Sequence, residues 1–335
     1  MVMASTAVRN EAESASANTS PLLSIVVPVY NGSKKIESTL QKLKSQVENL
    51  LPIVAKLEAQ SAGQEKSFVN TGRKIIENAS AAMLLDEYLS NHPADVPSVL
   101  GLQDAKADFH ETSSTSSWYE IIVVNDGSKD DTRHIVDEIS SADETIRLIS
   151  YSTNMGKGYA IKQGVLHSRG DYVMFMDGDG EISTETLSKY LERLSSADIV
   201  IASKYHPDSV VRVPTSRKFF SKCFHLFVKV MLGIKVSDTQ VGLKAGKGDS
   251  FRKIFQRVIV KRYAFDAEML AVARILGLRV DELPVKIDLD RSFKKKEIMK
   301  MALDVLGVAY RLRVVRWYQK NMEKQRPSYR ALVFA

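Results

Sequence analysis

The chain has 335 residues, of which 44% are hydrophobic, so it is long and apolar enough to bury a substantial core in one large or two small domains. Its single cysteine, Cys223, excludes an internal disulfide framework and is typical of a reducing compartment. The net charge of +7 conceals a split, because residues 1–203 carry 18 Lys and Arg against 28 Asp and Glu, whereas residues 204–335 carry 29 against 12.

Residues 1–20 are rich in Ala, Ser, Thr, Asn and Glu, contain no apolar segment of the kind found in secretory signals, and predict a disordered tail. A membrane-spanning helix needs about 20 apolar residues. The two most apolar helical stretches, 223–228 and 305–310, hold six residues each between charges. We therefore expect no transmembrane helix in this chain.

Short apolar runs predict five strands, and helical patterns lie between them. The strands are expected at 23–29, 119–124, 146–151, 172–176 and 199–202, and the helices include 157–168 and 184–194. Strands that alternate with helices predict an α/β fold with a Rossmann-like, mostly parallel sheet flanked by helices on both faces.

The segment between about residues 42 and 117 is much longer than one crossover between parallel strands requires. Residues 42–100 are rich in Ala, Leu, Glu, Lys and Gln at helical spacing, and residues 111–117 are typical of a linker. We predict a helical insertion, most simply a surface hairpin, within a domain that spans residues 21–290. Residues 291–335 are expected to form a basic amphipathic C-terminal helix and a tail.

Two of the predicted strands end in acidic turns. The stretch Glu120–Ser128 runs from a strand into an Asp-Gly turn, and Asp177-Gly178-Asp179 directly follows the apolar run 172–176. Open α/β sheets bind their ligands at the carboxyl ends of the strands. Hard divalent cations prefer oxygen ligands, and a metal held by one or two carboxylates plus a diphosphate is a common arrangement. The pair of turns therefore indicates a metal and diphosphate site, with solvated acidic loops as the alternative.

These two motifs and four others resemble family 2 glycosyltransferases of the GT-A fold, and most closely the branch that moves a sugar from a nucleotide sugar to dolichyl or polyprenyl phosphate. They occur in the family's order between about residues 22 and 320. The stretch Asp-Thr-Gln-Val-Gly-Leu-Lys at 238–244 is more similar to the dolichyl-phosphate glucosyltransferase branch than to the mannosyltransferase branch. The six motifs are residues 24–31, 120–132, 154–158, 177–179, 238–244 and 265–270.

The resemblance implies a pocket for the base of the nucleotide sugar. Asp126 matches the residue that accepts the imide hydrogen of uracil, and a simple Asp-Gly turn is the alternative interpretation. Pro28 and Tyr30 match positions that line the base pocket, where an aromatic ring can stack, and Asn31 follows them. The chain departs from the family by having Gly32 and Asn125 where relatives often carry acidic residues.

The resemblance also implies a divalent cation, Mg²⁺ or Mn²⁺, that bridges both donor phosphates and stabilises charge on the leaving nucleotide diphosphate. Asp179 is the first choice of ligand, and Asp177, separated from it by Gly178, contacts the metal or the ribose. Glu181 occupies the position of a further oxygen ligand. Lys157 opens a predicted helix and is placed to meet the donor phosphates at its N-terminus, a loop lysine being the alternative.

An acceptor phosphate monoester has a second pKa near ~6 and is largely a dianion at pH 7. Such an acceptor is already a nucleophile, so the protein must supply cations that bring two polyanions together. The resemblance implies four of them, Lys204, Arg217, Arg291 and Lys294. Any one of these side chains would ordinarily be interpreted as surface charge, and the set of four favours an acceptor-phosphate site.

Two acidic residues remain ambiguous in the sequence. Asp238 is the residue most similar to a catalytic base of the family, but orienting Arg217 or Lys204, or capping the following turn, are equal alternatives. Asp266, near the start of a predicted helix, is either a helix cap or a functional group.

Residues 218–232 have the pattern of an interfacial helix, and residues 297–318 repeat it more weakly. Together with the net charge of +17 in residues 204–335 and the lack of a nucleic-acid-binding module, the pattern predicts peripheral binding to the cytoplasmic face of a membrane. Two helices packed in the core are the alternative. The polar stripe is Lys218, Lys222, His225 and Lys229, and the remaining surface carries Phe219, Phe220, Phe224, Phe227, Val228 and Met231.

The sequence thus predicts an inverting, metal-dependent glycosyltransferase. It would move a hexose, glucose in preference to mannose, from UDP-glucose or GDP-mannose to dolichyl or polyprenyl phosphate. Two rivals are a GT-A enzyme with a soluble or glycan acceptor, which would need a true general base, and a non-catalytic scaffold that binds sugar nucleotides.

Overall fold

The computed structural model describes residues 21–54, 117–176, 184–212, 215–239, 241–288 and 295–324. For residues 184, 212–222, 286–288, 295–297 and 321–324 within these ranges it describes the backbone alone. The predicted disordered tail and most of the predicted insertion lie outside the described residues.

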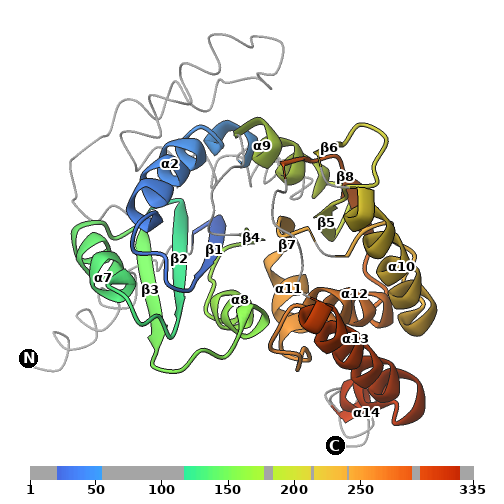
Figure 1. Ribbon diagram of the computed structural model, residues 1–335. Helices are drawn as coiled ribbons and strands as arrows, with labels where there is room; N and C mark the ends of the chain where they lie inside the picture. The colour runs from blue at the N-terminus through green and yellow to red at the C-terminus, as the bar shows by residue number, and fades with distance from the viewer. Residues whose placement is uncertain are drawn as a thin grey trace, which may run out of the picture.

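The described residues form one large sheet with the strand order β3-β2-β1-β4-β7-β5-β8 (Figure 1). All neighbouring strands are parallel except β7, which runs antiparallel to both β4 and β5. The short strands β6 (Val210–Arg212) and β9 (Lys286–Asp288) pair separately, in parallel. The strands of the large sheet are β1 (Leu23–Val29), β2 (Tyr119–Asp126), β3 (Ile146–Tyr151), β4 (Tyr172–Phe175), β5 (Ile199–Ala202), β7 (Lys244–Lys247) and β8 (Val280–Leu283).

Helices cover both faces of the sheet, which is why the central strands are apolar at successive positions and not at alternate ones. Helices α2 (Ile36–Glu48), α7 (Thr132–Ala142) and α9 (Thr184–Arg193) cover one face. On the other face lie α8 (Lys157–Leu166), α10 (Thr215–Leu232), α11 (Gly248–Phe255), α12 (Phe265–Ile275), α13 (Lys295–Ala309), the π-helical turn η3 (Tyr310–Val314) and α14 (Trp317–Lys324).

The predicted fold class, a mostly parallel sheet flanked by helices, is confirmed. Strands 23–29, 146–151 and 199–202 have the predicted bounds, and β2 continues two residues further than expected, to Asp126. The segment assigned to the insertion begins inside α2, where Leu43 and Val47 are buried in the core, so residues 42–54 belong at least partly to the helical layer.

The C-terminal segment 297–318, expected as one helix, is instead divided into α13, η3 and α14. Arg316 adopts a φ of 52°, in the left-handed region, and so ends the first helical run. The break turns Tyr318 into the core, where its side chain is fully buried. Among the described residues no helix is both long and apolar enough to cross a membrane.

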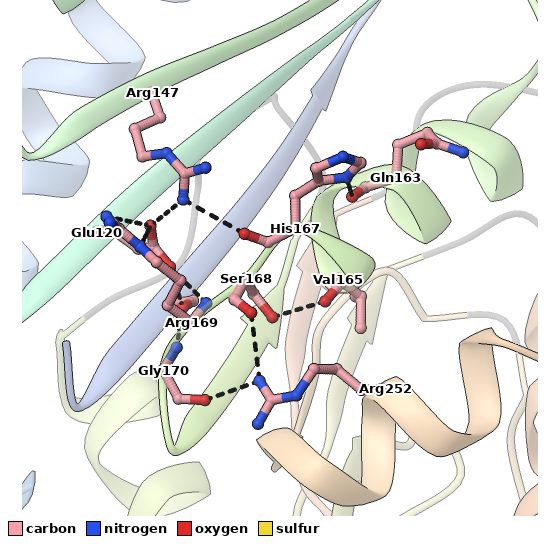
Figure 2. A network of polar contacts seen from close by, with 10 residues as sticks. Glu120, Arg147, Gln163, Val165, His167, Ser168, Arg169, Gly170 and Arg252 are labelled. Atoms are coloured by element: carbon pink, nitrogen blue, oxygen red, sulfur yellow. Dashed lines mark hydrogen bonds and ion pairs between the residues drawn. The ribbon is translucent and has the colours of Figure 1, made fainter. Parts of the chain in front are cut away.

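A buried carboxylate joins the amino-terminal ends of the strands (Figure 2). Glu120 accepts hydrogen bonds from the Ser24 hydroxyl (2.7 Å), from the backbone N–H of Arg169 (2.8 Å) and from the guanidinium of Arg147 (2.5 Å). Burial alone would raise the pKa of Glu120, but these hydrogen bonds and the charge of Arg147 lower it below its usual value. The network fixes β1, β2, β3 and the start of β4 relative to one another, so that their carboxyl ends meet at the opposite edge.

Candidate active site

The carboxyl ends of β1, β2, β4 and β5 lie along one edge of the sheet, and β7 begins there because it runs the opposite way. Of the described residues predicted for the donor, Tyr30 follows β1, Asp126 ends β2 and Lys157 follows β3. Of those predicted for the acceptor, Lys204 follows β5 and Asp238 precedes β7. The fold therefore brings these described residues to one edge, which is where open α/β sheets bind ligands.

Asp126 is the last residue of β2 and is nearly fully buried. Its Oδ1 accepts hydrogen bonds from the Tyr151 hydroxyl (2.8 Å) and the Met155 N–H (2.8 Å), and its Oδ2 accepts one from the Gly156 N–H (2.9 Å). The carboxylate thus holds the turn that leads into α8, a role that the sequence did not indicate. Since a carboxylate offers about four acceptor positions, Oδ2 retains capacity for one more donor.

The loops after β1 and β2 are joined by hydrogen bonds. The Asn31 side chain accepts a bond from the Lys129 N–H (2.8 Å), and the Asn31 N–H donates to Ser128 (2.9 Å). Asp130 accepts a bond from the Ser33 N–H (3.1 Å). The small loss of hydration at this exposed carboxylate would by itself raise the pKa of Asp130, but hydrogen bonds from Thr132 and Ser33 outweigh it and lower the pKa to about 2. Asn31 therefore has a structural part in shaping the predicted base pocket.

Tyr30, predicted to stack on the base, directly follows β1 and is 49% exposed. An exposed aromatic ring beside the ordered β1 and β2 loops is available to stack on a planar base. Pro28, within β1, is half-buried beneath the same edge.

Lys157 is the first residue of α8, directly after Gly156. Gly156 has a φ of 100°, and a Cβ there would come within 2.6 Å of the Lys261 carbonyl oxygen, so no other residue fits the turn. The same carbonyl accepts a hydrogen bond from the Tyr159 N–H (3.0 Å). The loop before α12 thus fixes the helix start at which Lys157 stands, and that helix start is suited to an anion.

Lys204 and Asp238 form a partly buried ion pair just beyond β5. Asp238 accepts hydrogen bonds from the Lys204 N–H (3.0 Å) and from the Lys204 Nζ (3.2 Å), while its own N–H donates to Glu282 on β8 (3.1 Å). Asp238 is 2% exposed, and the Lys204 side chain is 17% exposed. Of the alternatives left open by the sequence, this geometry matches the one in which Asp238 orients Lys204.

Asp266 does not cap its helix, because Ala264 occupies the cap position and no side chain caps it. Its carboxylate instead forms a buried ion pair with Lys244 at 2.6 Å. Lys244 also donates to the Val241 carbonyl (2.7 Å) and stands over the Phe175 ring at 5.6 Å from its centroid. The pair joins α12, the loop before β7 and the carboxyl end of β4. Sequence reasoning missed it, although both residues lie within recognised motifs.

Glu268, two residues further along α12, is fully buried and links the C-terminal helices to the site. Its Oε2 accepts the N–H groups of Ile259 (2.8 Å) and Val260 (2.7 Å), and its Oε1 accepts the Tyr318 hydroxyl and the Arg311 guanidinium. The loop held in this way is the one whose Lys261 carbonyl supports the start of α8. Burial raises the pKa of Tyr318, and the adjacent Glu268 carboxylate raises it further.

Helix α10 is oriented differently from the predicted interfacial helix. Phe224 and Phe227 pack against the core and Val228 is fully buried, so these residues do not form an outer aromatic face. The exposed apolar residues are instead Leu226 and Val230. For Lys218, Phe219, Phe220 and Lys222 the structure describes the backbone alone.

Several predicted site residues also fall outside the description. Asp177, Gly178, Asp179, Glu181, Arg291 and Lys294 lie outside the described residues, and only the backbone of Arg217, in the first turn of α10, is described. Strand β4 ends at Phe175, opposite Val26 of β1 and Lys244 of β7. Within the described ranges no group of three or more His, Cys, Asp or Glu side chains is arranged to hold a metal ion.

Comparison with known proteins bears on the family of this chain. The profile of Glycosyl transferase family 2 matches residues 105–255. Three dolichyl-phosphate beta-glucosyltransferases of Trichomonas vaginalis are 34%, 37% and 36% identical, over 61%, 62% and 58% of this chain, and the chain spans 63%, 66% and 64% of their length. A dolichyl-phosphate beta-glucosyltransferase of Dictyostelium discoideum is 30% identical over 261 residues, which cover 73% of this chain and 79% of that protein.

One further relative and one solved structure are also similar to this chain. An undecaprenyl-phosphate mannosyltransferase of Micrococcus luteus is 31% identical over 59% of this chain and 82% of its own length. A crystal structure of glucosyl-3-phosphoglycerate synthase from Mycobacterium tuberculosis with Mn²⁺, UDP-glucose and phosphoglyceric acid aligns with 90% of this chain and 82% of that chain, at 15% identity and a TM-score of 0.48. That structural likeness is too distant to carry an argument about the site. The sequence similarity to the Dictyostelium and Micrococcus proteins, each covered over more than two thirds of its length, shows that this chain belongs to glycosyl transferase family 2.

Proposed function

We propose that the protein transfers glucose from UDP-glucose to dolichyl or another polyprenyl phosphate, with inversion at the anomeric carbon and with the help of a divalent cation. The observation that carries the proposal is the Lys204–Asp238 pair, an oriented cation at the same edge of the sheet as the predicted donor pocket. The names of the relatives support the choice of acceptor and favour glucose over mannose.

On the donor side, Tyr30 would stack on uracil and the remaining acceptor position on Asp126 would receive its imide N–H. Lys157, at the start of α8, would contact the diphosphate. Asp177 and Asp179 would hold the cation, because they directly follow the buried strand β4 and supply the carboxylate oxygens that Mg²⁺ and Mn²⁺ prefer. When bound, the cation would neutralise the charge that develops on the departing UDP.

On the acceptor side, the phosphate monoester dianion would be its own nucleophile. Lys204 would draw it toward the donor, and Arg217, Arg291 and Lys294 would add further positive charge. Asp238 is buried and already accepts two hydrogen bonds from Lys204, which supports a role in orienting Lys204 and not in removing a proton. A soluble glycan acceptor with a neutral hydroxyl would require that proton removal, so the geometry favours a phosphate acceptor.

A transfer assay tests this function. The purified protein is incubated with radiolabelled UDP-glucose or GDP-mannose and a short-chain isoprenyl phosphate, in Mn²⁺ or Mg²⁺, and label entering the lipid phase is counted. Lys204→Met should abolish that label, whereas Lys189→Met, which removes a solvent-exposed lysine of α9, should not. Label found only in water-soluble glycan would support the rival enzyme, and binding of UDP-glucose without turnover would support the scaffold.

Asp126→Ala is expected to raise the KM for UDP-glucose about tenfold or more with a smaller fall in kcat, because base recognition is equal in ground and transition states. Tyr151→Phe removes one donor to the same carboxylate but keeps the carboxylate itself, so it should change the KM much less. Steady-state kinetics with UDP-glucose and N3-methyl-UDP-glucose would check the assignment. A fall in kcat at constant KM, or an equal effect of Tyr151→Phe, would show that Asp126 acts through the turn or the chemistry and not through the base.

We further propose that the outer surface of α10 and α13 contacts the membrane. These helices pack against each other (Figure 1). Each of them also carries exposed apolar side chains, which form two stripes. The exposed guanidinium of Arg313 donates to the Val230 carbonyl (2.7 Å), so positive charge borders the stripes. Apolar side chains flanked by basic ones match the boundary between headgroups and acyl chains. The stripes are Leu226 and Val230 on α10, and Met299, Leu303 and Leu306 on α13, continuing to Tyr310 and Val314 in η3.

Leu226→Ser/Val230→Ser is expected to lower affinity for anionic vesicles about tenfold or more, because full burial of one such side chain contributes about 1.5–3 kcal/mol. Transfer to long-chain lipid phosphate should slow, while hydrolysis of UDP-glucose should be unchanged. Ile259→Ser, which alters an exposed apolar residue outside both helices, is the matched control. Co-sedimentation with vesicles beside a thermal melt gives the answer, and unchanged sedimentation with a normal melt would remove the membrane surface from the proposal.

A further inference from the structure

His225 lies on the inner side of α10, in a position that the function described above leaves unused. Its side chain is half-buried, and its ring packs on the Tyr205 ring at 5.8 Å between centroids with 45° between the planes. Its Nδ1 is fully buried and has no hydrogen-bond partner among the described residues. A buried polar nitrogen left without a partner destabilises the folded state. If His225 served only to pack the core, replacing it by an apolar ring would increase the stability of the protein.

The ring of Tyr205 connects His225 to the predicted acceptor cation. Lys204 Nζ stands over the Tyr205 ring at 5.1 Å from its centroid, and the buried Asp238 carboxylate holds the same Nζ at 3.2 Å. The imidazole and the ammonium group therefore both contact one aromatic ring. An anion bound by Lys204 would therefore lie close to the His225 imidazole.

Charged groups from each element around His225 act on its protonation. Burial lowers the pKa of His225 below its usual value, and the positive charges of Lys229, on α10 itself, and of Lys204 lower it further. Asp238 and Glu282 act in the opposite direction but do not outweigh burial. The imidazole is therefore neutral at pH 7 before substrate arrives. A dianion placed beside it would reverse the balance and favour the protonated form.

We propose that His225 is a further residue of the acceptor-phosphate site, which donates a hydrogen bond to the phosphate monoester beside Lys204 and takes up a proton from solvent as that dianion binds. The inference rests on the proposed function and extends it. In the transfer, a phosphate oxygen forms the bond to the anomeric carbon, the bond from that carbon to UDP breaks, and the acceptor changes from a dianionic monoester to a monoanionic diester. The product then holds the imidazolium less strongly, and His225 returns its proton to solvent.

The test uses His225→Gln, which keeps a hydrogen-bond donor but cannot titrate, and His225→Phe, which keeps the ring contact with Tyr205. The matched control is His134→Gln, whose imidazole is 75% exposed on α7. We expect His225→Phe to raise the KM for citronellyl phosphate about tenfold, with the KM for UDP-glucose and the melting temperature unchanged. His225→Gln should have a smaller effect on that KM.

Proton uptake separates this role from a packing role. Calorimetric titration of citronellyl phosphate at pH 7.5, in buffers with different ionisation enthalpies, should show proton uptake by the wild type and the His134 variant, and little by His225→Gln. For the same reason the wild-type affinity for the acceptor should fall as pH rises above 7, and the His225→Gln affinity should fall less.

The outcomes are distinguishable. A wild-type protein that makes no lipid product from citronellyl phosphate overturns the proposed function, and the inference falls with it. A wild type that makes the product, with the acceptor KM of both variants within twofold of normal, overturns the inference alone. If His225→Phe lowers the melting temperature, His225→Gln decides: normal proton uptake in that variant contradicts the proposal.

Discussion

Replacing Asp179 by Asn is expected to lower transfer to lipid phosphate by about 10³-fold or more while leaving the melting temperature unchanged. The substitution keeps the shape of the side chain but removes a negatively charged oxygen from the proposed cation site, which follows β4 in the sequence. Loss of one preorganised group that stabilises developing charge commonly costs ~10²–10³ in kcat, and a metal ligand also affects metal occupancy. The assay is run at saturating Mn²⁺ and Mg²⁺, so that weakened metal affinity alone does not explain the loss.

Two further measurements make the metal assignment decisive. EDTA should stop transfer by the wild type, and added Mn²⁺ or Mg²⁺ should restore it. Binding of Mn²⁺ in the presence of UDP, followed by electron paramagnetic resonance, should weaken in Asp179→Asn and stay normal in Asp249→Asn, which alters an exposed carboxylate of α11. Turnover like that of the wild type in Asp179→Asn would refute Asp179 as a ligand.

Breaking the Lys244–Asp266 pair is expected to be the most damaging single change to stability. Lys244 is 1% exposed and the Asp266 side chain 6%, so Asp266→Leu would leave an ammonium group buried without its counter-charge. Removing one partner of a buried ion pair typically costs about 3–5 kcal/mol, whereas replacing both partners by apolar side chains is often close to neutral. Lys244→Met/Asp266→Leu should therefore recover much of the stability that either single variant loses.

The double variant also separates stability from activity. It lacks the Lys244 bond to the Val241 carbonyl, so the loop that carries Asp238 should be less well held and kcat should fall even where the fold is stable. Denaturant unfolding of the two single variants and the double variant, beside the same cycle on the exposed Lys189–Glu185 pair of α9, measures the coupling. The exposed pair should show little coupling, because solvent screens its charges. A cost below 1 kcal/mol for both single variants at the buried pair would contradict this account.

The local pattern of the sequence predicted five of the seven strands in the large sheet, and missed β7 and β8. Strands 23–29 and 199–202 have the bounds that their apolar runs predict, because a strand buried on both faces must be apolar at successive positions. Strand 146–151 also has its predicted bounds, although it lies at the edge of the sheet and is only partly buried. The turns that follow the strands were also predictable, since Asp126 closes β2 and Lys157 opens α8 as their motifs indicate. The motifs likewise identified the family correctly.

Side-chain partners far apart in the chain were decided by the tertiary structure alone. Asp266 pairs with Lys244, 22 residues away, and Glu268 accepts the hydroxyl of Tyr318, 50 residues away. No local spacing encodes such a pair, because each member looks like a cap or a surface charge until the sheet brings it to its partner. The division of the C-terminal helix has the same origin, since η3 and α14 turn Arg311 and Tyr318 toward Glu268.

The orientation of α10 could not be predicted from the sequence either. The helix is apolar around most of its circumference, so its pattern allowed Phe224 and Phe227 to face either the core or the outside. Because α10 packs against α12 and α13, Phe224 and Phe227 face the interior, and Leu226 and Val230 remain exposed. The same rotation brought His225 to Tyr205. Sequence periodicity fixes which residues share a face of a helix, whereas the neighbours that bury the most apolar surface decide which face turns inward.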